Sequence, residues 1–310
     1  MESFLHAISS VTIILLLTAT GYLCAARGWM DARAKAFISK FLMTLAIPCM
    51  CLYSFQTNLS RGLLGQSLRM LLAGFCSCLL DFLLAFALGK LLRLPRRRLG
   101  IFIMMCAVSN CVFIGLAMCT ELFGSECTPY VMLYWMVSTT FMQLGGVSLV
   151  RWSGEAGGLS AKMLLHFLKT PTILGTLAAI ALVLLDVRLP ALVMTYCRYM
   201  NNLVTPLALL LTGYIIHELG LKNLRIDRAL GAMLLFRFIA APAVCALFCA
   251  SFGVAGLARS VYIVEAAMPV VTQTVVASAE YGADEQFAAQ GAALSTIACF
   301  AVIPVLMLLL

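Results

Sequence analysis

Long apolar runs separated by short charged or turn-rich breaks make up most of the chain. A helix that spans a bilayer needs about 20 apolar residues, and most of these runs reach that length. The pattern predicts ten membrane-spanning helices, at Leu5–Ala26, Ala36–Phe55, Leu68–Leu92, Leu99–Phe123, Pro129–Val150, Pro171–Leu185, Ala191–Ile216, Ala229–Phe252, Val261–Tyr281 and Phe287–Leu310. The sixth run is short, and the amphipathic stretch Lys162–Lys169 is a candidate extension of it. No run alternates strictly with a period of two, as barrel strands do, so we expect an all-α integral membrane fold.

Composition agrees with this pattern. Of 310 residues, 63% are hydrophobic and only 11% are charged, whereas about a quarter are charged in globular proteins. Soluble, disordered and collagen-like classes are excluded by this bias. The first run lacks the basic segment of a secretory signal and fits a full span. We therefore expect a multi-pass protein of the cell (inner or plasma) membrane, in contact with the lipid bilayer.

The basic residues gather in alternate loops. The loops after the first, third, fifth and seventh runs hold Arg27, Arg33, Lys35; Arg93, Arg96, Arg97, Arg98; Arg151, Lys162, Lys169; and Lys222, Arg225, Arg228. Because Lys and Arg are retained on the cytoplasmic side, these loops are predicted to lie inside and both termini outside. No soluble stretch is long enough for a nucleic-acid-binding face, so no nucleic-acid partner is expected.

Short matches at a shared spacing suggest an internal repeat. Pro48 and Pro206 are 158 residues apart, as are Gly124 and Gly282, and the pair Ser138-Thr139 precedes Ser295-Thr296 by 157. We predict two five-helix repeats, residues 1–155 and 156–310. Since five spans is an odd number, the second repeat must be inverted in the membrane, as in many secondary transporters.

The fourth and ninth runs each contain residues that interrupt a helix near its middle. Proline removes a backbone hydrogen bond, and an amide or a glycine weakens the helical ladder. Broken helices at the midplane expose backbone donors and positive half-helix ends, which would bind an anion. The expected substrate-binding residues are Ser109, Asn110, Gly115, Met268, Pro269, Thr272 and Gln273. The alternative is that Pro269 only kinks its helix and Asn110 bonds a neighbouring one; two breaks at repeat-equivalent places favour the binding site.

Three ionisable residues lie inside predicted spans: Asp81, Arg237 and Glu265. Each costs about 2.5 to 3.5 kcal/mol on insertion scales, so each needs a partner, a cavity or a function. Glu265 lies one turn before Pro269 and is a candidate for proton coupling, because burial favours the neutral acid. A structural ion pair of Arg237 with Asp81 or Glu265 explains the same residues equally well.

No catalytic or metal-binding constellation is evident. His6, His166 and His217 lack ligand spacing, and the thirteen cysteines contain no CxxC pair, so they are interpreted as small buried hydrophobes. Nucleotide-binding and nucleophile-elbow motifs are also missing. We expect no enzyme activity, no metal and no cofactor.

The chain resembles a known family in an ordered set of motifs. These are Gly21-Tyr22, Arg27-Gly28, Asp31, Ala46-Ile47-Pro48, Tyr53-Ser54-Phe55, Ser109-Asn110 with Gly115, Leu122-Phe123-Gly124, Met268-Pro269, Tyr281-Gly282 and Leu294-Ser295-Thr296. They are similar to the auxin efflux carrier family, which includes plant auxin exporters and bacterial permeases proposed to move malate or malonate.

The resemblance implies ten helices in two inverted repeats. Helices 1, 2, 6 and 7 would form a scaffold, helices 3–5 and 8–10 a transport domain, and helices 4 and 9 would cross at the substrate. One departure is that the family's Gly-Ile-Pro in helix 4 is Gly115-Leu116-Ala117 here. The 20-residue stretch 151–170 between helices 5 and 6 is short, as in the bacterial-type carriers.

The leading hypothesis is a secondary or facilitated transporter of a small organic anion, a carboxylate such as auxin or malate, working by elevator-type alternating access. A sodium- or proton-coupled symporter or antiporter on the same ten-helix plan is the alternative, and a homodimer is left open. A non-transporting membrane sensor would be expected to carry a long cytoplasmic tail, whereas the sequence ends at Leu308-Leu309-Leu310.

Overall fold

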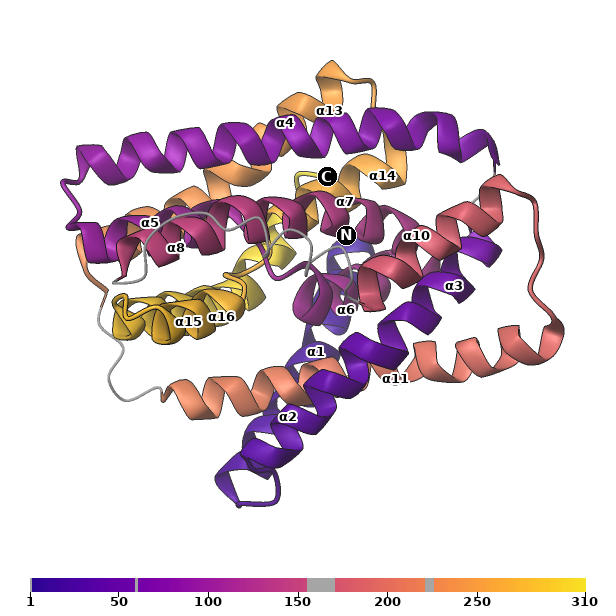
Figure 1. The fold of residues 1–310 in the computed structure, drawn as a ribbon, viewed down its shortest axis with the longest axis horizontal. Helices are drawn as coiled ribbons and strands as arrows, with labels where there is room; N and C mark the ends of the chain where they lie inside the picture. Colours follow the sequence, from indigo (N-terminus) through magenta and orange to yellow (C-terminus); the bar gives the residue numbers. More distant parts are fainter. Residues whose placement is uncertain (1, 59–60, 155–170, 221–225) are drawn as a thin grey trace.

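The computed structural model describes residues 2–58, 61–154, 171–220 and 226–310, and these segments are almost entirely helical (Figure 1). Within them the only β-type pairing is one isolated antiparallel bridge between Ser109 and Val270. The prediction of an all-α fold is therefore confirmed for this part of the chain.

The helices of the first half follow the order of the predicted runs. They are α1 (Glu2–Ala26), α2 (Ala32–Phe41), α3 (Ile47–Asn58), α4 (Arg61–Leu91), α5 (Arg96–Ala107), α6 (Leu116–Phe123), α7 (Thr128–Phe141) and α8 (Val147–Ser153). Three π-helical segments join or precede them: η1 (Leu42–Ala46), η2 (Cys111–Gly115) and η4 (Met142–Gly146), and the short 3₁₀ turn η3 (Ser125–Cys127) leads into α7.

The helices of the second half also follow the order of the predicted runs. They are α10 (Pro171–Leu184), α11 (Ala191–Leu219), α12 (Arg228–Leu235), the π-helical η6 (Phe236–Ala240), α13 (Ala241–Ser251), α14 (Gly256–Ala266), α15 (Gln273–Glu280) and α16 (Glu285–Leu306). The helix α10 agrees with the sixth predicted run to within one residue, whereas its proposed extension over Lys162–Lys169 lies outside the described residues.

Five helices of the described segments are long and apolar enough to cross a membrane. They span Ala32–Thr57, Ser67–Leu91, Ala191–Glu218, Arg228–Ser251 and Glu285–Leu306, and shorter apolar helices lie at Thr12–Ala26, Cys111–Phe123 and Leu174–Leu184. The predicted runs Leu99–Phe123 and Val261–Tyr281 are each divided in two, because helical structure stops at residues 108–110 and 267–272. Each half is too short to span a bilayer on its own.

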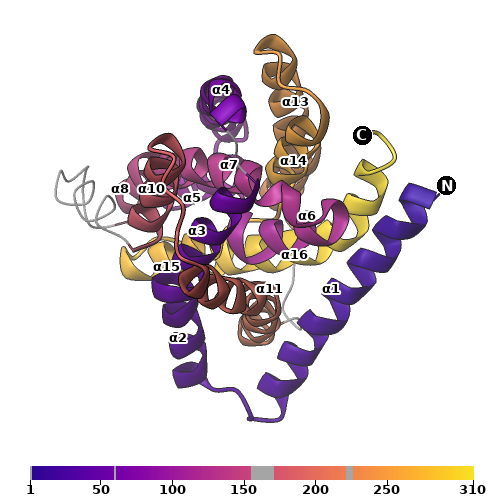
Figure 2. The ribbon, with the colours of Figure 1, turned by 90° about the vertical axis from the view of Figure 1, so that its right-hand side faces the viewer.

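The helices pack in two groups. In one, α1 lies along α11, and α3 packs against α10 and α11; in the other, α4, α5, α7, α8, α13 and α14 pack against one another, and α15 against α16 (Figures 1 and 2). The family resemblance implies a scaffold role for the helices of the first group and a transport-domain role for those of the second.

The backbones of α1 and α11 touch where they cross. A Cβ atom added at Gly21 would lie 2.1 Å from the carbonyl oxygen of Leu210, and one at Gly213 would lie 2.0 Å from the carbonyl oxygen of Thr18. Small residues at membrane helix crossings allow this close approach, which increases van der Waals contact where hydrophobic burial gives no driving force.

The helix α4 has one apolar outer face and one buried inner face. Its exposed large side chains recur every three or four residues, at Leu68, Leu72, Phe75, Leu79, Leu83 and Phe86. The buried side chains Met70, Ala73, Ser77, Asp81 and Ala85 recur with the same spacing on the inner face. An apolar face of this kind suits contact with lipid, and it leaves the ionisable Asp81 directed toward protein.

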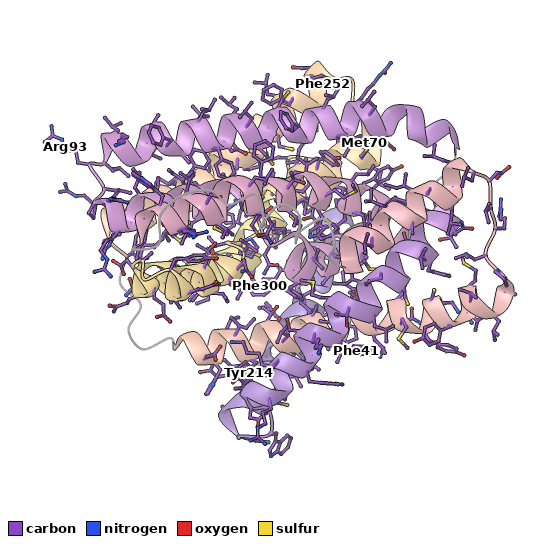
Figure 3. All side chains as sticks on the ribbon, viewed as in Figure 1. Phe41, Met70, Arg93, Tyr214, Phe252 and Phe300 are labelled. Carbon is purple, nitrogen blue, oxygen red and sulfur yellow. The ribbon has the colours of Figure 1, made fainter. Side chains whose placement is uncertain are left out.

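One end of the molecule carries a network of arginines. Arg98 donates to Asp284 at 2.6 Å and to Asp227 at 3.1 Å, and Arg97 donates to the carbonyl oxygen of Gly282 at 3.1 Å. Arg93, labelled in Figure 3, marks the same end, opposite the connection between α10 and α11. The turns that precede α5, α12 and α16 therefore lie together, as alternate loops of a membrane protein should.

Candidate functional site

The two helix breaks meet in the middle of the molecule. The helix α5 ends at Ala107, and the following residues turn extended, with Val108 at φ −113° and ψ 124°. The backbone N–H of Asn110 donates to the carbonyl oxygen of Pro269 at 2.8 Å, beside the bridge between Ser109 and Val270. Two short extended segments thus pair antiparallel, each satisfying backbone groups that the neighbouring helices leave free.

Asn110 determines how the helical structure resumes after the first break. Its side-chain Oδ1 accepts from the backbone N–H of Phe113 at 3.3 Å, so it caps η2, and its carbonyl oxygen accepts from the N–H of Gly115 at 2.9 Å. Asparagine is among the preferred N-cap residues for this reason. Because Oδ1 is used by the cap, the group that Asn110 can offer a ligand is its Nδ2 donor.

Pro269 and Ser295 shape the second break. Proline has no N–H to donate, and the N–H of the next residue, Val270, donates to the Ser295 Oγ at 3.0 Å instead of to a helical carbonyl. Helical structure resumes at Gln273, with Thr272 as an N-cap that makes no side-chain cap hydrogen bond. Among the described residues, the N–H groups of Thr272 and Gln273 have no hydrogen-bond acceptor.

A cavity of about 410 Å³ lies against both breaks. It is lined by Lys35, Ser39, Met43, Val108, Ser109, Asn110, Cys111, Val112, Phe113, Trp135, Ser138, Thr139, Met142, Gln143, Leu211, Ile215, Val271, Thr272, Gln273 and Val276. Its size falls in the range of small-molecule sites, and its walls combine apolar side chains with a few polar groups. The structure thus places four of the predicted residues, Ser109, Asn110, Thr272 and Gln273, at one cavity.

The other three predicted binding residues lie behind the cavity and do not line it. Met268 and Pro269 are buried and form the backbone of the crossing. Gly115 faces a carboxyl group: a Cβ atom at this position would lie 2.3 Å from Glu265 Oε2. These residues therefore shape the breaks, and Gly115 leaves room for Glu265.

Lys35 is the only charged side chain in the lining of this cavity as described. It forms an ion pair with Glu218 and lies 5.8 Å above the ring of Tyr214. The sequence had suggested that Lys35 belongs to a loop, because the apolar run begins at Ala36. This assignment is wrong, since Asp31 caps the helix by accepting from Ala34 N–H and α2 already begins at Ala32. The hydrophobic pattern missed the first turn of α2 because that turn is polar.

Two carboxyl groups are buried: Glu265 lies near the crossing of the breaks, and Asp81 lies on the inner face of α4. Glu265 is fully buried; its Oε1 accepts from the Cys119 thiol at 3.4 Å, while its Oε2 has no hydrogen-bond partner among the described residues. Asp81 is 1% exposed, and its Oδ1 is likewise without a described partner. Buried polar atoms without partners are rare and ask for an explanation, so both groups are notable.

Arg237 is fully buried between the same helices. It donates from Nη1 to the carbonyl oxygen of Cys106 at 2.9 Å and from Nη2 to that of Ala266. In the described part of the chain, the ion pairs join Lys35 to Glu218 and Arg98 to Asp227 and Asp284. The guanidinium is thus engaged by backbone oxygens.

Two Ser-Thr pairs lie at the breaks or the cavity, although the sequence analysis did not count them among the binding residues. Ser138 and Thr139 line the cavity, as does Cys111 beside the first break. Ser295 accepts from the second break, and Thr296 lies with Asn110 around a small adjoining pocket. The available signal in the sequence was their spacing of 157 residues, close to that of the other repeat matches.

Among the described residues, no three or more His, Cys, Asp or Glu side chains lie together in a way that could hold a metal ion. The site consists of neutral donors, one lysine and apolar walls.

Comparison with known proteins assigns the chain to a family. A family described as membrane transport protein matches residues 6–161 and 158–307, which together cover nearly the whole chain. The chain belongs to this family. The likeness to the auxin efflux carriers is thereby confirmed, and the molecule is a multi-pass membrane transport protein.

One similar protein agrees with this assignment. The chain is 24% identical over 297 residues to the "Uncharacterized transporter MJ1031" of Methanocaldococcus jannaschii, an alignment that covers 92% of this chain and 93% of that protein. The similarity runs through both halves, so it includes the two helix breaks.

Proposed function

We propose that this protein is a secondary or facilitated transporter of a small organic anion, a carboxylate of the auxin or malate type. The observation that carries the proposal is the cavity at the crossing of the two breaks, where η2 and α15 begin and where Asn110 and Gln273 lie. The first turn of a helix carries unpaired N–H groups and a partial positive charge, which favour an anion.

The donors at this site fit a carboxylate better than a cation. Asn110 offers Nδ2, Gln273 lines the cavity at the start of α15, and Lys35 adds one positive charge at the α2 side. A hydrogen bond to a charged group is worth about 1.5 to 3 kcal/mol, so two or three such donors suffice for the millimolar to micromolar binding typical of carriers.

We further propose the ten-helix plan of two inverted repeats, residues 1–155 and 156–310, with both termini outside. Support comes from the left-handed backbone positions that end helices. Gly28 (φ 70°) and Asp186 (φ 58°) are 158 residues apart, and so are Gly124 (φ 77°) and Gly282 (φ 69°). Left-handed backbone is costly for a residue other than glycine, yet Asp186 adopts it 158 residues after Gly28. This recurrence at equal spacing favours a shared architecture of the two halves over coincidence.

Elevator-type movement is the mechanism that this packing favours. The cavity takes Lys35, Ser39, Met43, Leu211 and Ile215 from the group of helices around α11, and the rest of its lining from the group that carries the breaks. A ligand bound at the breaks would therefore face the other group across the cavity. Sliding of one group against the other would carry the ligand between the two sides of the membrane.

Flux measurements in proteoliposomes test the proposal. Purified carrier would be given a panel of labelled dicarboxylates, aromatic monocarboxylates and, as controls, amino acids and sugars. We expect saturable flux of one carboxylate class only, competed by its unlabelled form. Absence of flux for every carboxylate, in protein that is folded and correctly inserted, would contradict an organic-anion carrier.

A coupled symporter or antiporter is the second candidate, and the buried Glu265 favours it. Glu265 lies one turn before Pro269, close to the second break, and its Oε2 has no hydrogen-bond partner among the described residues. An acid in this place can exchange a proton when its surroundings change during turnover. Flux that depends on an imposed proton or sodium gradient would establish coupling, and flux that is indifferent to both would leave facilitated transport.

A further inference from the structure

The two helix breaks share one support that the proposed function does not use. Arg237 donates from one guanidinium nitrogen to Cys106 O and from another to Ala266 O. Cys106 lies in the last turn of α5 and Ala266 is the last residue of α14, so both oxygens belong to carboxyl ends of half-helices. Such carbonyl groups have no partner within their own helix and cost free energy when they are buried without one.

Arginine suits this task for geometric reasons. Its planar guanidinium presents several N–H donors in a fixed fork, so one side chain can reach two acceptors on different helices. Its positive charge also complements the partial negative charge that the macrodipole gives to each helix carboxyl end. Arg237 is fully buried, where an unpaired charge is costly; these two carbonyl oxygens satisfy its Nη1 and Nη2, while its Nε has no hydrogen-bond partner among the described residues.

The local backbone directs Arg237 to this position. It is the second residue of η6, a five-residue π-helical segment between α12 and α13. A π-helical turn holds one more residue than an α-helical turn, and therefore changes the direction in which the following side chains leave the helix. Such turns are often found at functional sites.

At each break, the helical segment that ends lies away from the cavity, and the segment that begins lies beside it. Of the two broken helices, the amino ends of η2 and α15 contribute Asn110, Cys111, Thr272 and Gln273 to its lining, whereas Arg237, Cys106 and Ala266 do not line it. We propose that Arg237 is a positioning residue: it ties the carboxyl ends of α5 and α14 together, so that the paired segments 108–110 and 267–272 keep the anion-binding donors aligned. This inference deepens the proposed function, since it concerns the same site.

Asp81 on the inner face of α4 lies within reach of the charge of Arg237, as do the thiols of Cys78, Cys106 and Cys111, although no ion pair joins Asp81 to Arg237 among the described residues. Arg237 could therefore be retained only to balance Asp81. The two roles differ in what happens when both charges are removed together.

Hydrogen exchange on the substrate-free carrier separates these roles. The variants are Arg237→Met, which removes all donors at similar length, the double variant Asp81→Asn with Arg237→Met, and Arg259→Met as a control on the exposed face of α14. We expect Arg237→Met to lower the protection of peptides covering 104–115 and 263–274 by about tenfold or more, with little change elsewhere, and the double variant to show the same loss. The control should behave as the wild type.

Three results would overturn the proposal. They are unchanged protection in Arg237→Met, a loss spread evenly over all helices, and recovery of protection in the double variant, which would reduce Arg237 to a counter-charge. If Arg237→Met does not accumulate in the membrane, Arg237→Lys decides the matter. Lysine keeps the positive charge but carries it on a single nitrogen. We therefore expect folded protein with reduced protection at one or both breaks. Wild-type protection at both breaks would contradict the proposal that the two-pronged guanidinium is needed to hold them together. Because no substrate is needed, the outcome is independent of whether the carrier moves organic anions.

Discussion

The backbone N–H of Asn110 and the carbonyl oxygen of Pro269, 2.8 Å apart, join the two helix breaks directly. These residues are 159 positions apart in the chain, almost the spacing of the repeat matches, so under the proposed repeat they would be near-equivalent residues of the two halves. That contact is expected where a two-fold pseudo-symmetry axis passes through the molecule. It also satisfies backbone groups that lipid could not.

Asn110→Ala and Gln273→Leu should lower transport much more than they lower the amount of folded protein. Each removes a donor from the cavity, and a lost donor to a charged ligand costs about 1 to 3 kcal/mol, or roughly five- to a hundredfold in affinity. Concentration dependence of flux measures the change. Asn202→Ala, on the exposed side of α11, is the matched control. Wild-type affinity in both site variants would mean that the anion binds elsewhere.

Glu265→Gln should keep substrate binding and remove the pH dependence of transport. The amide mimics the protonated acid at nearly constant volume, so the variant cannot exchange a proton during turnover. Rates measured from acidic to alkaline pH, with Glu285→Gln as an exposed control, would reveal it. A folded variant that keeps the wild-type pH profile would remove Glu265 from the mechanism.

Gly115→Ala should alter transport through the displacement of Glu265. The new methyl group would lie 2.3 Å from Oε2 and would push the carboxyl away, while the backbone at φ −60° and ψ −50° accepts alanine without strain. We expect a rate reduced by about tenfold or more with normal expression, because an acid that is about 1 Å out of place is a poor participant. Shortening the acid with Glu265→Asp in the same chain should restore part of the rate.

The matched control for Gly115→Ala is the same substitution at another helical glycine that has free space around it. Gly231→Ala in α12 meets only Ile226 Cγ2, at 3.9 Å. This change should leave transport as it is and stabilise the helix by about 0.5 to 1 kcal/mol. Equal losses in the two variants would show that glycine in general, rather than the space beside Glu265, is required.

Lys35→Gln should weaken binding of the anion and make it less sensitive to salt, because the cavity loses its described positive charge. Glu218→Gln should act in the opposite direction by releasing Lys35 from its ion pair. An exposed pair of this kind contributes only about 0 to 1 kcal/mol, so neither change should prevent folding. Arg33→Gln, on an exposed side chain two residues earlier, is the control.

Cysteine labelling in membranes should place position 97 on the inside. Native cysteines in the described segments are buried or half-buried, so the wild type sets a low background. Arg97→Cys should react with a membrane-impermeant reagent only after permeabilisation, whereas Arg188→Cys, at the opposite end between α10 and α11, should react from outside. The reverse pattern would invert the proposed topology.

Much of the fold could be predicted from hydrophobic length alone. Runs such as Ala191–Ile216 became single helices within a few residues of the expected ends, because a spanning helix must hide its backbone from lipid. The breaks were also located correctly, since Pro269 and Asn110 are residues whose chemistry interrupts a helix. Pro206 and Pro304 show the limit of this signal, because both lie inside continuous helices, α11 and α16.

The contacts between distant elements could not be predicted. Nothing in the sequence near Arg237 indicates Cys106 or Ala266 as its partners, because these are backbone oxygens that any residue would provide. Lys35 was taken for a loop residue because hydropathy does not register a polar first turn. Gly115 was recognised as a helix weakener, whereas its neighbour in space, Glu265, is 150 positions away in the chain.

The glycine crossing of α1 and α11 limits which surfaces can move. With Gly21 against Leu210 and Gly213 against Thr18, a shift by one residue, about 1.5 Å along the axis, would bring a side chain into the space that only hydrogen now fills. The close backbone packing at these two glycines therefore fixes the axial register of α1 against α11. If one group of helices slides against the other as proposed, the wall that Leu211 and Ile215 give to the cavity would therefore keep its place relative to α1.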